Sequence, residues 1–581
     1  MAEQPDSLSA NALESAATIT QIGVEALDAE TAVEMTTAVA VQEETQTETN
    51  VRVAKATGVL AMGNIASRVL GMAREVVMTN LFGASIATDA FYIATIIPKT
   101  LYDLLIAGHV NGAIIPVLSE VATRNKQEFW RLTSVLLTLT TVITGLLTIL
   151  LTLFAPQAVS LVSSGADEAT FDLAVNLLRL TSPALILLGL FSILSGALYA
   201  LRSFTWPAFS GVVFNGAIVV LTFALTPLFR PNDPTGQGIQ AAAMGWVAGS
   251  LGQLLLQTFG LRGAQLRINF NFRHPAVKQV VKLYIPVMFS LIVDTLIVRT
   301  FSYNLASQTG TGSLGYMNWA TTLIQFPQGL VATAISIAIL PTLARQALIA
   351  TETKDETSFR DTLGLGLRLS ITLILPATVG LFVLAQPIIS LLFERGEFTP
   401  QNTLITMDVL RLYLIGLPFA AVDLLLVYAF YARKDTLTPA LIGVFSLIVY
   451  MIVAIVLLPS IGLFSLMIAD SVKHVVHASI SSVILWRRVK GLGKQRITLT
   501  LIKAGTAALV MGIVAALVEP IAEQFLGEYV GRQFFREVAL VVLAGGLSVL
   551  VYGALAWLFK LEEFAWIVGM IRSRLPRRLR G

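Results

Sequence analysis

Six charged side chains lie inside or at the ends of two long apolar segments between residues 57 and 120: Arg68, Arg74, Glu75, Asp89, Lys99 and Asp103. An unpaired charge at the centre of a bilayer costs about 3 kcal/mol on insertion scales, so such groups normally face a wet cavity or a partner. Cations held in this way are suited to binding phosphate oxygens, arginine above all because of its planar fork. The stretch therefore predicts the lining of a polar chamber.

The bulk composition is typical of a polytopic membrane protein. Of the 581 residues, 55% are hydrophobic and 13% are charged, and the mean hydropathy is +0.75. The absence of cysteine excludes disulfides and thiolate catalysis, and four histidines leave little material for a metal centre. The sequence has no GxxxxGK[ST] phosphate loop, and this excludes transport driven directly by ATP hydrolysis within this chain. We expect neither an enzyme nor a cofactor, and no nucleic-acid partner.

Both ends of the chain differ from its apolar body. Residues 1–50 hold ten Asp and Glu but no Lys or Arg, so the other 531 residues carry 40 Lys and Arg against 26 Asp and Glu. Residues 1–50 lack the basic and apolar regions of a signal peptide and predict an acidic, disordered cytoplasmic tail. Residues 560–581 predict a basic cytoplasmic tail, which serves either as a positive-inside anchor or as a surface for anionic headgroups.

The apolar runs predict an all-α protein with fourteen transmembrane helices. We expect kinks at Pro98, Pro286 and Pro327, because three of the runs exceed one bilayer thickness. The runs are residues 57–80, 86–118, 131–155, 175–201, 207–229, 238–261, 277–308, 313–345, 362–386, 405–433, 438–458, 462–488, 499–519 and 534–559.

The distribution of Lys and Arg predicts the orientation. With the N-terminus inside, 28 Lys and Arg lie on the inner side and four on the outer side. Positive residues stay on the cytoplasmic side, and an even number of crossings returns the C-terminus there. Both termini are therefore expected to be cytoplasmic.

An internal repeat divides the apolar body. ALYALRSFTWPA at 197–208 matches AFYARKDTLTPA at 429–440, and APQAVSLV at 155–162 matches AQPIISLL at 385–392. The separation of about 230 residues equals six predicted spans, so both copies enter the membrane in the same sense, as in transporters with parallel repeats. We expect a six-helix lobe at 57–261, a second six-helix lobe at 277–488, and two additional transmembrane helices at 499–559.

Several of these segments resemble the MviN/MurJ family, the lipid II flippases of the multidrug/oligosaccharidyl-lipid/polysaccharide exporter superfamily. The resemblance is carried by SRVLGMAREVVMTNLFGASIATDAFYIA, IIPVLSE, FPQGLVATAISIAILPTLAR, LLFERGEFTP and FYARKDTLTP, in that order. It implies a transporter of the bacterial inner membrane that moves a polyprenyl-diphosphate-linked sugar, usually lipid II for peptidoglycan synthesis, to the outer leaflet by alternating access. Membrane lipids and cell-wall synthesis proteins are the partners expected with it.

The resemblance also assigns substrate-binding residues. Arg68 and Arg74 match the family's two first-helix arginines, and Asp89 matches its acidic residue in the second helix. Two alternatives remain for Arg74, a contact with the substrate or a pair with Glu75 or Asp89. Glu75 is a candidate for gating or coupling.

Some family positions are not matched. Tyr102 and Ala107 stand where many members carry Arg and Glu, and Thr321 and Thr322 stand where the eighth helix usually has Asp-Arg. Lys99 and Arg299 would restore the positive charge and complete the predicted substrate site. The alternative is local pairing of Arg299 with Asp294, which is a further candidate for gating or coupling.

These departures keep other functions open. The chain could export another lipid-linked oligosaccharide or amphipathic substrate, or act as a transport-inactive membrane scaffold for envelope assembly. For transport, the membrane potential or an ion gradient is the expected driving force. A second group of charges, Asp423, Asp470 and Lys473, is expected to pair inside the second lobe, with His474 and His477 on a polar helix face or in a proton-sensing patch.

Overall fold

The computed structural model describes residues 58–104, 113–232, 237–261, 263–529, 533–566 and 569. By their contacts, residues 1–62 and residues 63–581 form two compact units. Residues 58–62, the described part of the first unit, are helical, and the second unit begins with helical residues 63–82. The predicted tail at 1–50 lies wholly outside the described residues, and the predicted tail at 560–581 lies largely outside them.

Throughout the described residues the regular structure is helical, without a strand. Its N-terminal elements are α3 (Ile86–Tyr102), α4 (Ile115–Arg124), α5 (Lys126–Leu153), α6 (Ala155–Val162), α7 (Glu168–Thr181), α8 (Ala184–Ala200), α9 (Thr205–Ala208), α10 (Ser210–Phe229), η3 (Arg230–Asn232) and α11 (Gln240–Thr258). The central elements are α12 (Pro275–Leu291), η4 (Ile292–Val298), α13 (Arg299–Ser307), α14 (Ser313–Pro327), η5 (Gln328–Thr333) and α15 (Ala334–Thr353). The C-terminal elements are α16 (Thr357–Val383), α17 (Ala385–Phe393), α18 (Pro400–Ala432), α19 (Leu437–Ile461), α20 (Phe464–Arg488), η6 (Gly493–Gln495), α21 (Ile497–Tyr529) and α22 (Gln533–Leu558).

The chain is an all-helical polytopic membrane protein. Eight helices in its described part are long and apolar enough to cross a membrane, or nine if α7 and α8, bent by 43°, form one span. The described residues of the fourteen apolar runs lie largely in helices. Some of these helices fall short of a full span in the described residues, such as α3 with 17 residues. Fourteen crossings therefore stay a prediction.

One interruption follows Pro327, the last residue of α14. A proline removes a main-chain donor and disturbs the regular helical hydrogen bonds. The six residues Gln328–Thr333 after it form a π-helical turn, and α15 continues beyond. Pro98 lies inside α3. The Pro286 side chain is outside the described residues.

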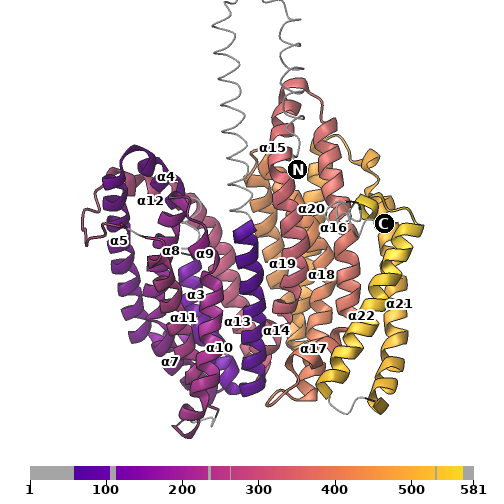
Figure 1. Cartoon of the computed structure of the whole chain (residues 1–581), viewed down its shortest axis with the longest axis horizontal. Coiled ribbons are helices and arrows are strands. Elements are labelled where there is room, and N and C mark those ends of the chain that lie inside the picture. Colours follow the sequence, from indigo (N-terminus) through magenta and orange to yellow (C-terminus); the bar gives the residue numbers. More distant parts are fainter. Residues whose placement is uncertain are drawn as a thin grey trace, which may run out of the picture. The chain divides into compact units, whose positions relative to one another are not determined.

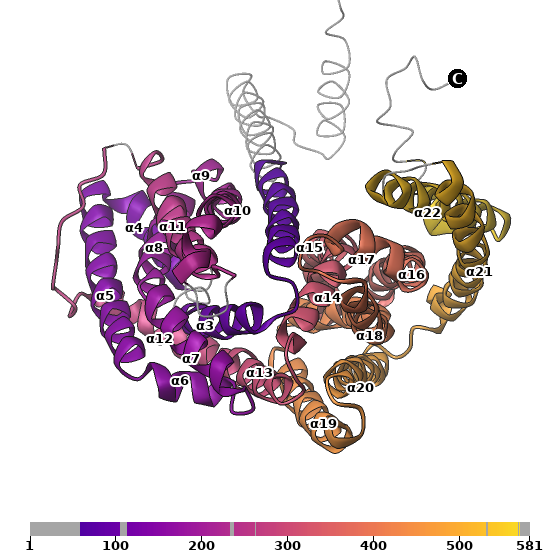
Figure 2. The same ribbon diagram turned by 90° about the horizontal axis from the view of Figure 1, so that it is seen from below.

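Within residues 63–581, the helices pack as two groups that follow the chain order (Figures 1 and 2). In the first group α3 packs on α7, α5 on α8, and α10 on α11. In the second, α18 packs on α16 and α20, and α19 on α20, while α21 and α22 form a hairpin against α16 and α17. Buried apolar side chains from both groups meet in one large core cluster that includes Phe91, Leu178, Trp319 and Leu410.

The predicted repeat recurs as matching local structure. Arg202 and Lys434, separated by 232 residues, each adopt a left-handed conformation with φ of 59° between two helices. The same backbone hydrogen bond closes both turns: Ser203 N to Leu198 O at 2.8 Å, and Asp435 N to Phe430 O at 3.0 Å. These are the bonds of a Schellman helix end. The helix breaks at Phe154 and Leu384, separated by 230 residues, each precede a short helix.

Candidate functional site

The first helix directs its two arginines to different places. Arg68 Nη1 donates to the Gln325 carbonyl in α14 at 2.8 Å. Its guanidinium also lies against Gly329, where an added Cβ would be 2.5 Å from Arg68 Nη2, so a side chain at residue 329 would displace it. The contacts with Gln325 and Gly329 therefore join the first helix to the end of α14 and to the turn that follows Pro327.

Arg74 belongs to a buried network with Glu75. Arg74 Nη2 lies 2.5 Å from Glu75 Oε1, and Arg74 Nη1 donates to Asn215 Oδ1 of α10 at 3.1 Å. The other carboxylate oxygen of Glu75 accepts from the Tyr92 hydroxyl of α3 at 2.6 Å. Since Glu75 is only 1% exposed, these contacts compensate a carboxylate that would otherwise be costly to bury. Of the two pairing partners predicted for Arg74, the structure contains Glu75 rather than Asp89.

Lys99 and Arg299 lie near this network. Arg299 Nη1 is 2.6 Å from Asp103 Oδ2, with the two side chains 37% and 24% exposed. Lys99 is exposed although its neighbours Pro98 and Thr100 are buried. It interacts electrostatically with Asp103, Arg299, Arg74 and Glu75. The side chain of Asp294, the alternative partner predicted for Arg299, lies outside the described residues.

We refer to Arg74, Lys99 and Arg299 as the cation cluster. Among the described side chains, Glu75 and Asp103 are the carboxylates that interact with it, so this described set has one positive charge in excess. An excess cation among membrane helices is costly unless an anion or water reaches it. Lys99 is exposed and Arg299 is partly exposed, so these two side chains are the accessible members of the cation cluster.

The unmatched family positions are neutral here. The Tyr102 hydroxyl lies 2.9 Å from Ser192 Oγ in α8. The hydroxyls of Thr321 and Thr322 donate to carbonyls of their own helix, Met317 O at 3.0 Å and Asn318 O at 2.9 Å. Ala107 is outside the described residues. None of the three described side chains contributes charge to the site.

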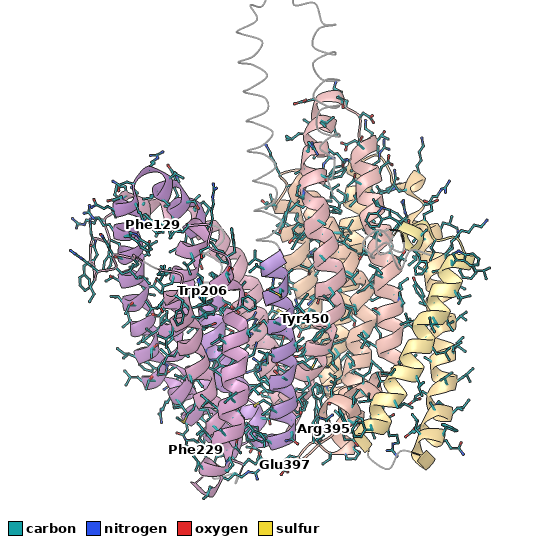
Figure 3. The ribbon with its side chains drawn as sticks, in the orientation of Figure 1. Phe129, Trp206, Phe229, Arg395, Glu397 and Tyr450 are labelled. Carbon is teal, nitrogen blue, oxygen red and sulfur yellow. The ribbon has the colours of Figure 1, made fainter. Side chains whose placement is uncertain are left out.

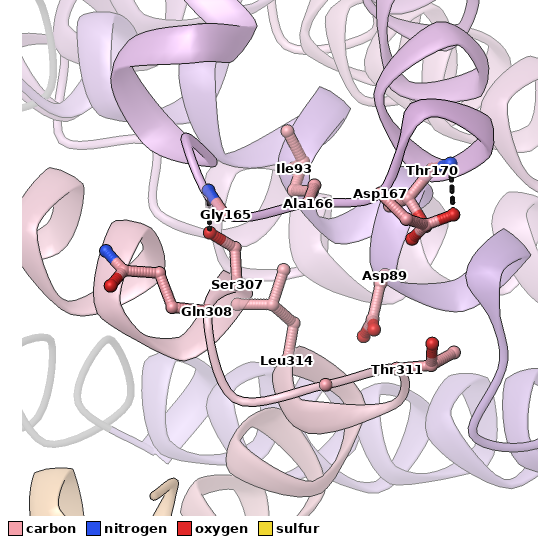
Figure 4. A pocket seen from close by; sticks show the side chains of 11 residues that line it. Asp89, Ile93, Gly165, Ala166, Asp167, Thr170, Ser307, Gln308, Thr311 and Leu314 are labelled. Carbon is pink, nitrogen blue, oxygen red and sulfur yellow. Dashed lines mark hydrogen bonds between the residues drawn. The ribbon is translucent and has the colours of Figure 1, made fainter. Parts of the chain in front are cut away.

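Asp89 contacts the beginning of α14 instead of the cation cluster. Its carboxylate accepts from Gly312 N at 2.5 Å and from Gly315 N at 3.2 Å. A carboxylate there satisfies otherwise unpaired amides at a helix N-terminus. Asp89 also lines a cavity of about 190 Å³ beside Asp167, Gln308 and Leu314 (Figure 4).

Further contacts beside Asp89 connect the two helix groups. Glu397 N donates to Asn80 O at 3.0 Å, and Gly165 N donates to Ser307 Oγ at 3.3 Å. Glu397 lies at one end of the helices (Figure 3). We call the contacts Asp89–Gly312, Asp89–Gly315, Asn80–Glu397 and Gly165–Ser307 the seal.

Glycines permit the close approach within the seal. Gly83 has a φ of 57°, and a Cβ there would lie 2.3 Å from Glu397 O. Gly396 has the same φ, and its Cβ would lie 2.1 Å from Asn80 O. Any larger residue would meet both backbone strain and main-chain overlap.

Comparison with known proteins identifies the family. The family model described as "Lipid II flippase MurJ" matches residues 78–536. The chain belongs to the MurJ lipid II flippase family. A MurJ protein of Burkholderia cenocepacia, named as a lipid II flippase, is 32% identical over 413 residues, which cover 68% of this chain and 77% of that protein. A probable lipid II flippase MurJ of Haemophilus influenzae is 30% identical over 84% of this chain and 96% of its own.

Solved structures show that the MurJ fold is shared. A lipid II flippase MurJ in an inward closed conformation superposes with a TM-score of 0.69 at 23% identity, covering 86% of this chain and 98% of that one. An inward-facing multidrug resistance transporter of the MATE family and MOP superfamily gives a TM-score of 0.59 at 16% identity, covering 74% and 96% of the two chains. This MurJ family member thus has a transporter fold.

Three residues complete the site of this MurJ family member without having been predicted. Asn215 had a detectable signal, because an amide in the middle of the apolar run SGVVFNGAIVV needs a partner. Tyr92 and Gln325 had none, since the first is one of several buried aromatics and the second contributes its main-chain carbonyl. Among the described residues, no group of three or more His, Asp or Glu could hold a metal ion.

Proposed function

We propose that this MurJ family member is a secondary-type transporter that moves lipid II from the inner to the outer leaflet for peptidoglycan synthesis. The cation cluster carries the proposal. Lipid II presents a diphosphate, and the cluster offers Arg74, Lys99 and Arg299 against two carboxylates. Charge-assisted hydrogen bonds to phosphate are among the strongest that side chains form.

The proposed membrane arrangement has fourteen spans with both termini in the cytoplasm. The lobes are residues 57–261 and 277–488, followed by two helices at 499–559. The bias of 28 inner against four outer Lys and Arg supports this orientation. The tails at 1–50 and 560–581 would meet cell-wall synthesis proteins and anionic lipids in the cytoplasm.

In this arrangement the seal lies at the outer end of the lobes. The Asp89 carboxylate on the α14 amides would hold that end closed while lipid II enters from the inner leaflet. We therefore assign Asp89 a gating role in addition to its predicted place on the substrate path. Glu75 would gate by holding Arg74, and Asp294 remains a candidate for gating or coupling.

The transport cycle follows from these assignments. The diphosphate binds the cation cluster while the prenyl chain stays in the lipid through a lateral opening. Closure of the inner end and opening of the seal then expose the headgroup outside. The membrane potential favours this direction, because each negative charge that leaves the negative side gains about 2.3 kcal/mol per 100 mV.

The test is flipping by the full chain reconstituted in liposomes with fluorescent lipid II. Arg299→Ala should slow flipping about 100-fold, the loss expected when a charge-assisted phosphate contact of 1.5–3 kcal/mol disappears. Arg179→Ala is the matched control, because it removes an exposed arginine of α7 outside the cation cluster. Equal rates for the two variants would contradict the proposal.

A second candidate cargo follows from the neutral Tyr102, Thr321 and Thr322. Fewer cations than the family resemblance predicts would suit another lipid-linked sugar. The same assay with competing lipid-linked sugars separates the two cargoes by which one competes. A transport-inactive scaffold would move neither lipid.

A further inference from the structure

A second group of charged side chains lies in the C-terminal helices, away from the cation cluster. We call it the α20 charge cluster. It consists of Asp423 on α18 and of Asp470, Lys473, His474 and His477 on α20. None of these five residues has a role in the flipping cycle proposed above.

The five side chains contact one another across two helices. Lys473 Nζ lies 2.5 Å from Asp470 Oδ1, and His474 Nε2 lies 3.6 Å from Asp470 Oδ2. His477 Nδ1 lies 2.5 Å from Asp423 Oδ1. His474 interacts electrostatically with the other four, so the two pairs form one charged group.

The composition of the α20 charge cluster leaves a place for one proton. Two carboxylates face one ammonium and two imidazoles. With both imidazoles neutral, the cluster has a net charge of −1, and one bound proton makes it neutral. Net charge among membrane helices is costly, and histidine is the side chain that takes up a proton near neutral pH. The cluster can therefore exist with and without that proton.

In the described part of the chain, the further titratable groups that interact with Asp470 include two phenols, Tyr413 of α18 and Tyr450 of α19. A phenol in its protonated form is neutral and adds no charge to the cluster. Lys473 Nζ lies 5.6 Å from the centroid of the Tyr450 ring. Tyr450 lies far from both ends of the helices (Figure 3), which places the cluster deep in the bundle.

Water has a route to this depth. A cavity of about 230 Å³ between α14, α18 and α20 is lined by Asp470 and His474, with Gln325 and Gln328 opposite. A cavity of that size with polar walls can hold several water molecules. Gln325 is also the residue whose carbonyl accepts from Arg68 of the first helix. The cavity therefore connects the α20 charge cluster with the contact between the first helix and α14.

We propose that the α20 charge cluster is a proton-binding site whose occupancy is coupled to lipid movement. The inference rests on the proposed function and deepens it by naming the coupling ion. The proton passes from water in the cavity to an imidazole nitrogen of His474 or His477 and returns to water in the opposite state of the protein. No other reactant takes part.

The test measures the leaflet ratio of fluorescent lipid II at equilibrium in liposomes that contain the full chain. A pH difference of one unit is imposed, and valinomycin with equal potassium holds the membrane potential at zero. One proton per lipid supports up to about tenfold enrichment in one leaflet, because one pH unit corresponds to a factor of ten in proton activity. If protons and lipid are exchanged in opposite directions, the lipid accumulates on the acidic side. If they are transported together, it accumulates on the alkaline side. Either result requires coupling.

The double variant His474→Gln/His477→Gln should still equilibrate the lipid, but at a ratio of one. His274→Gln is the matched control, since His274 lies beside Glu128 outside the cluster. It should keep the wild-type enrichment. A ratio of one in the wild-type protein overturns the coupling inference, whereas absence of any lipid movement overturns the proposed function.

A second measurement does not depend on whether the variants fold. The chain has four histidines, so nitrogen NMR of the histidine-labelled wild-type protein resolves few signals. At least one imidazole of the cluster should change its protonation state when a lipid diphosphate is added at constant pH. Imidazole signals that the lipid leaves unchanged would overturn the assignment.

Discussion

The cation cluster and the α20 charge cluster differ in how their charge is compensated. In the first, three cations face Glu75 and Asp103, and the described side chains leave one positive charge for a ligand. In the second, Lys473 faces two carboxylates, and what remains is a negative charge beside two imidazoles. An excess of positive charge suits an anionic lipid, whereas an excess of negative charge beside groups that can be protonated suits a proton. The same physical cost of buried charge thus leads to two kinds of site.

The largest expected effect comes from Arg74→Ala. It leaves the buried Glu75 carboxylate without its cation, and breaking such a pair costs about 3–5 kcal/mol. We expect a large loss of unfolding free energy in detergent together with loss of lipid II flipping. Denaturant unfolding and the liposome assay measure the two effects.

The double variant Arg74→Ala/Glu75→Gln separates these effects. Removing the carboxylate's charge should restore most of the stability, because no unpaired anion remains buried. Flipping should stay low, since the cation is still missing. Recovery of flipping along with stability would mean that Arg74 only compensates Glu75.

A smaller effect is expected for Lys473→Met in the α20 charge cluster. Lys473 and Asp470 are 21% and 26% exposed, so the uncompensated carboxylate can be partly hydrated. We expect a loss of about 1–2 kcal/mol, less than for Arg74→Ala. The double variant Lys473→Met/Asp470→Asn should be nearly as stable as the wild type. A loss as large as that of Arg74→Ala would remove the distinction between the clusters.

The smallest effect concerns the turn that repeats between the halves. Burial alone would raise the pKa of Asp435, but hydrogen bonds from Thr438 and the ion pair with Arg488 lower it to about 2. Because this pKa is below the unfolded value of 3.8, the stabilisation is complete above pH 4 and is lost as the pH falls towards 2. Because Asp435 and Arg488 are 20% and 41% exposed, solvent screening limits this contribution to about 0.5–1 kcal/mol.

Asp435→Ser supplies the test, since the first half has Ser203 at the equivalent turn. The variant should lose this acid-dependent part of its stability, measured by denaturant unfolding at pH 5 and pH 3. Identical pH dependence in both proteins would show that the pair with Arg488 contributes nothing measurable.

The sequence predicted the helices well and the pairing between them poorly. The length of an apolar run can be read along the sequence, and the described residues of the predicted runs lie largely in helices. The repeat could also be read from the sequence, and Arg202 and Lys434 share the turn conformation. The described helices give eight or nine candidate spans, depending on whether the bent pair α7 and α8 is one span, so they do not test the predicted fourteen.

The ion pairs of the candidate site could be predicted only where the two residues are neighbours in the sequence. Arg74 and Glu75 are neighbours in the chain, and their pairing was one of two alternatives. Arg299 and Asp103 are 196 residues apart, and only the packing of their helices brings them together. Asp89 was expected among the substrate-binding residues, but its contacts are main-chain amides that no residue pattern reveals.

The seal has a consequence for how such proteins diverge. In each of its contacts at least one partner is a main-chain atom: the amides of Gly312 and Gly315, the Asn80 carbonyl and the Gly165 amide. A main-chain atom is unchanged by most substitutions at its position. Correlated substitutions between homologues should therefore be weak across this junction, and methods that infer contacts from covariation would underestimate how firmly it is joined.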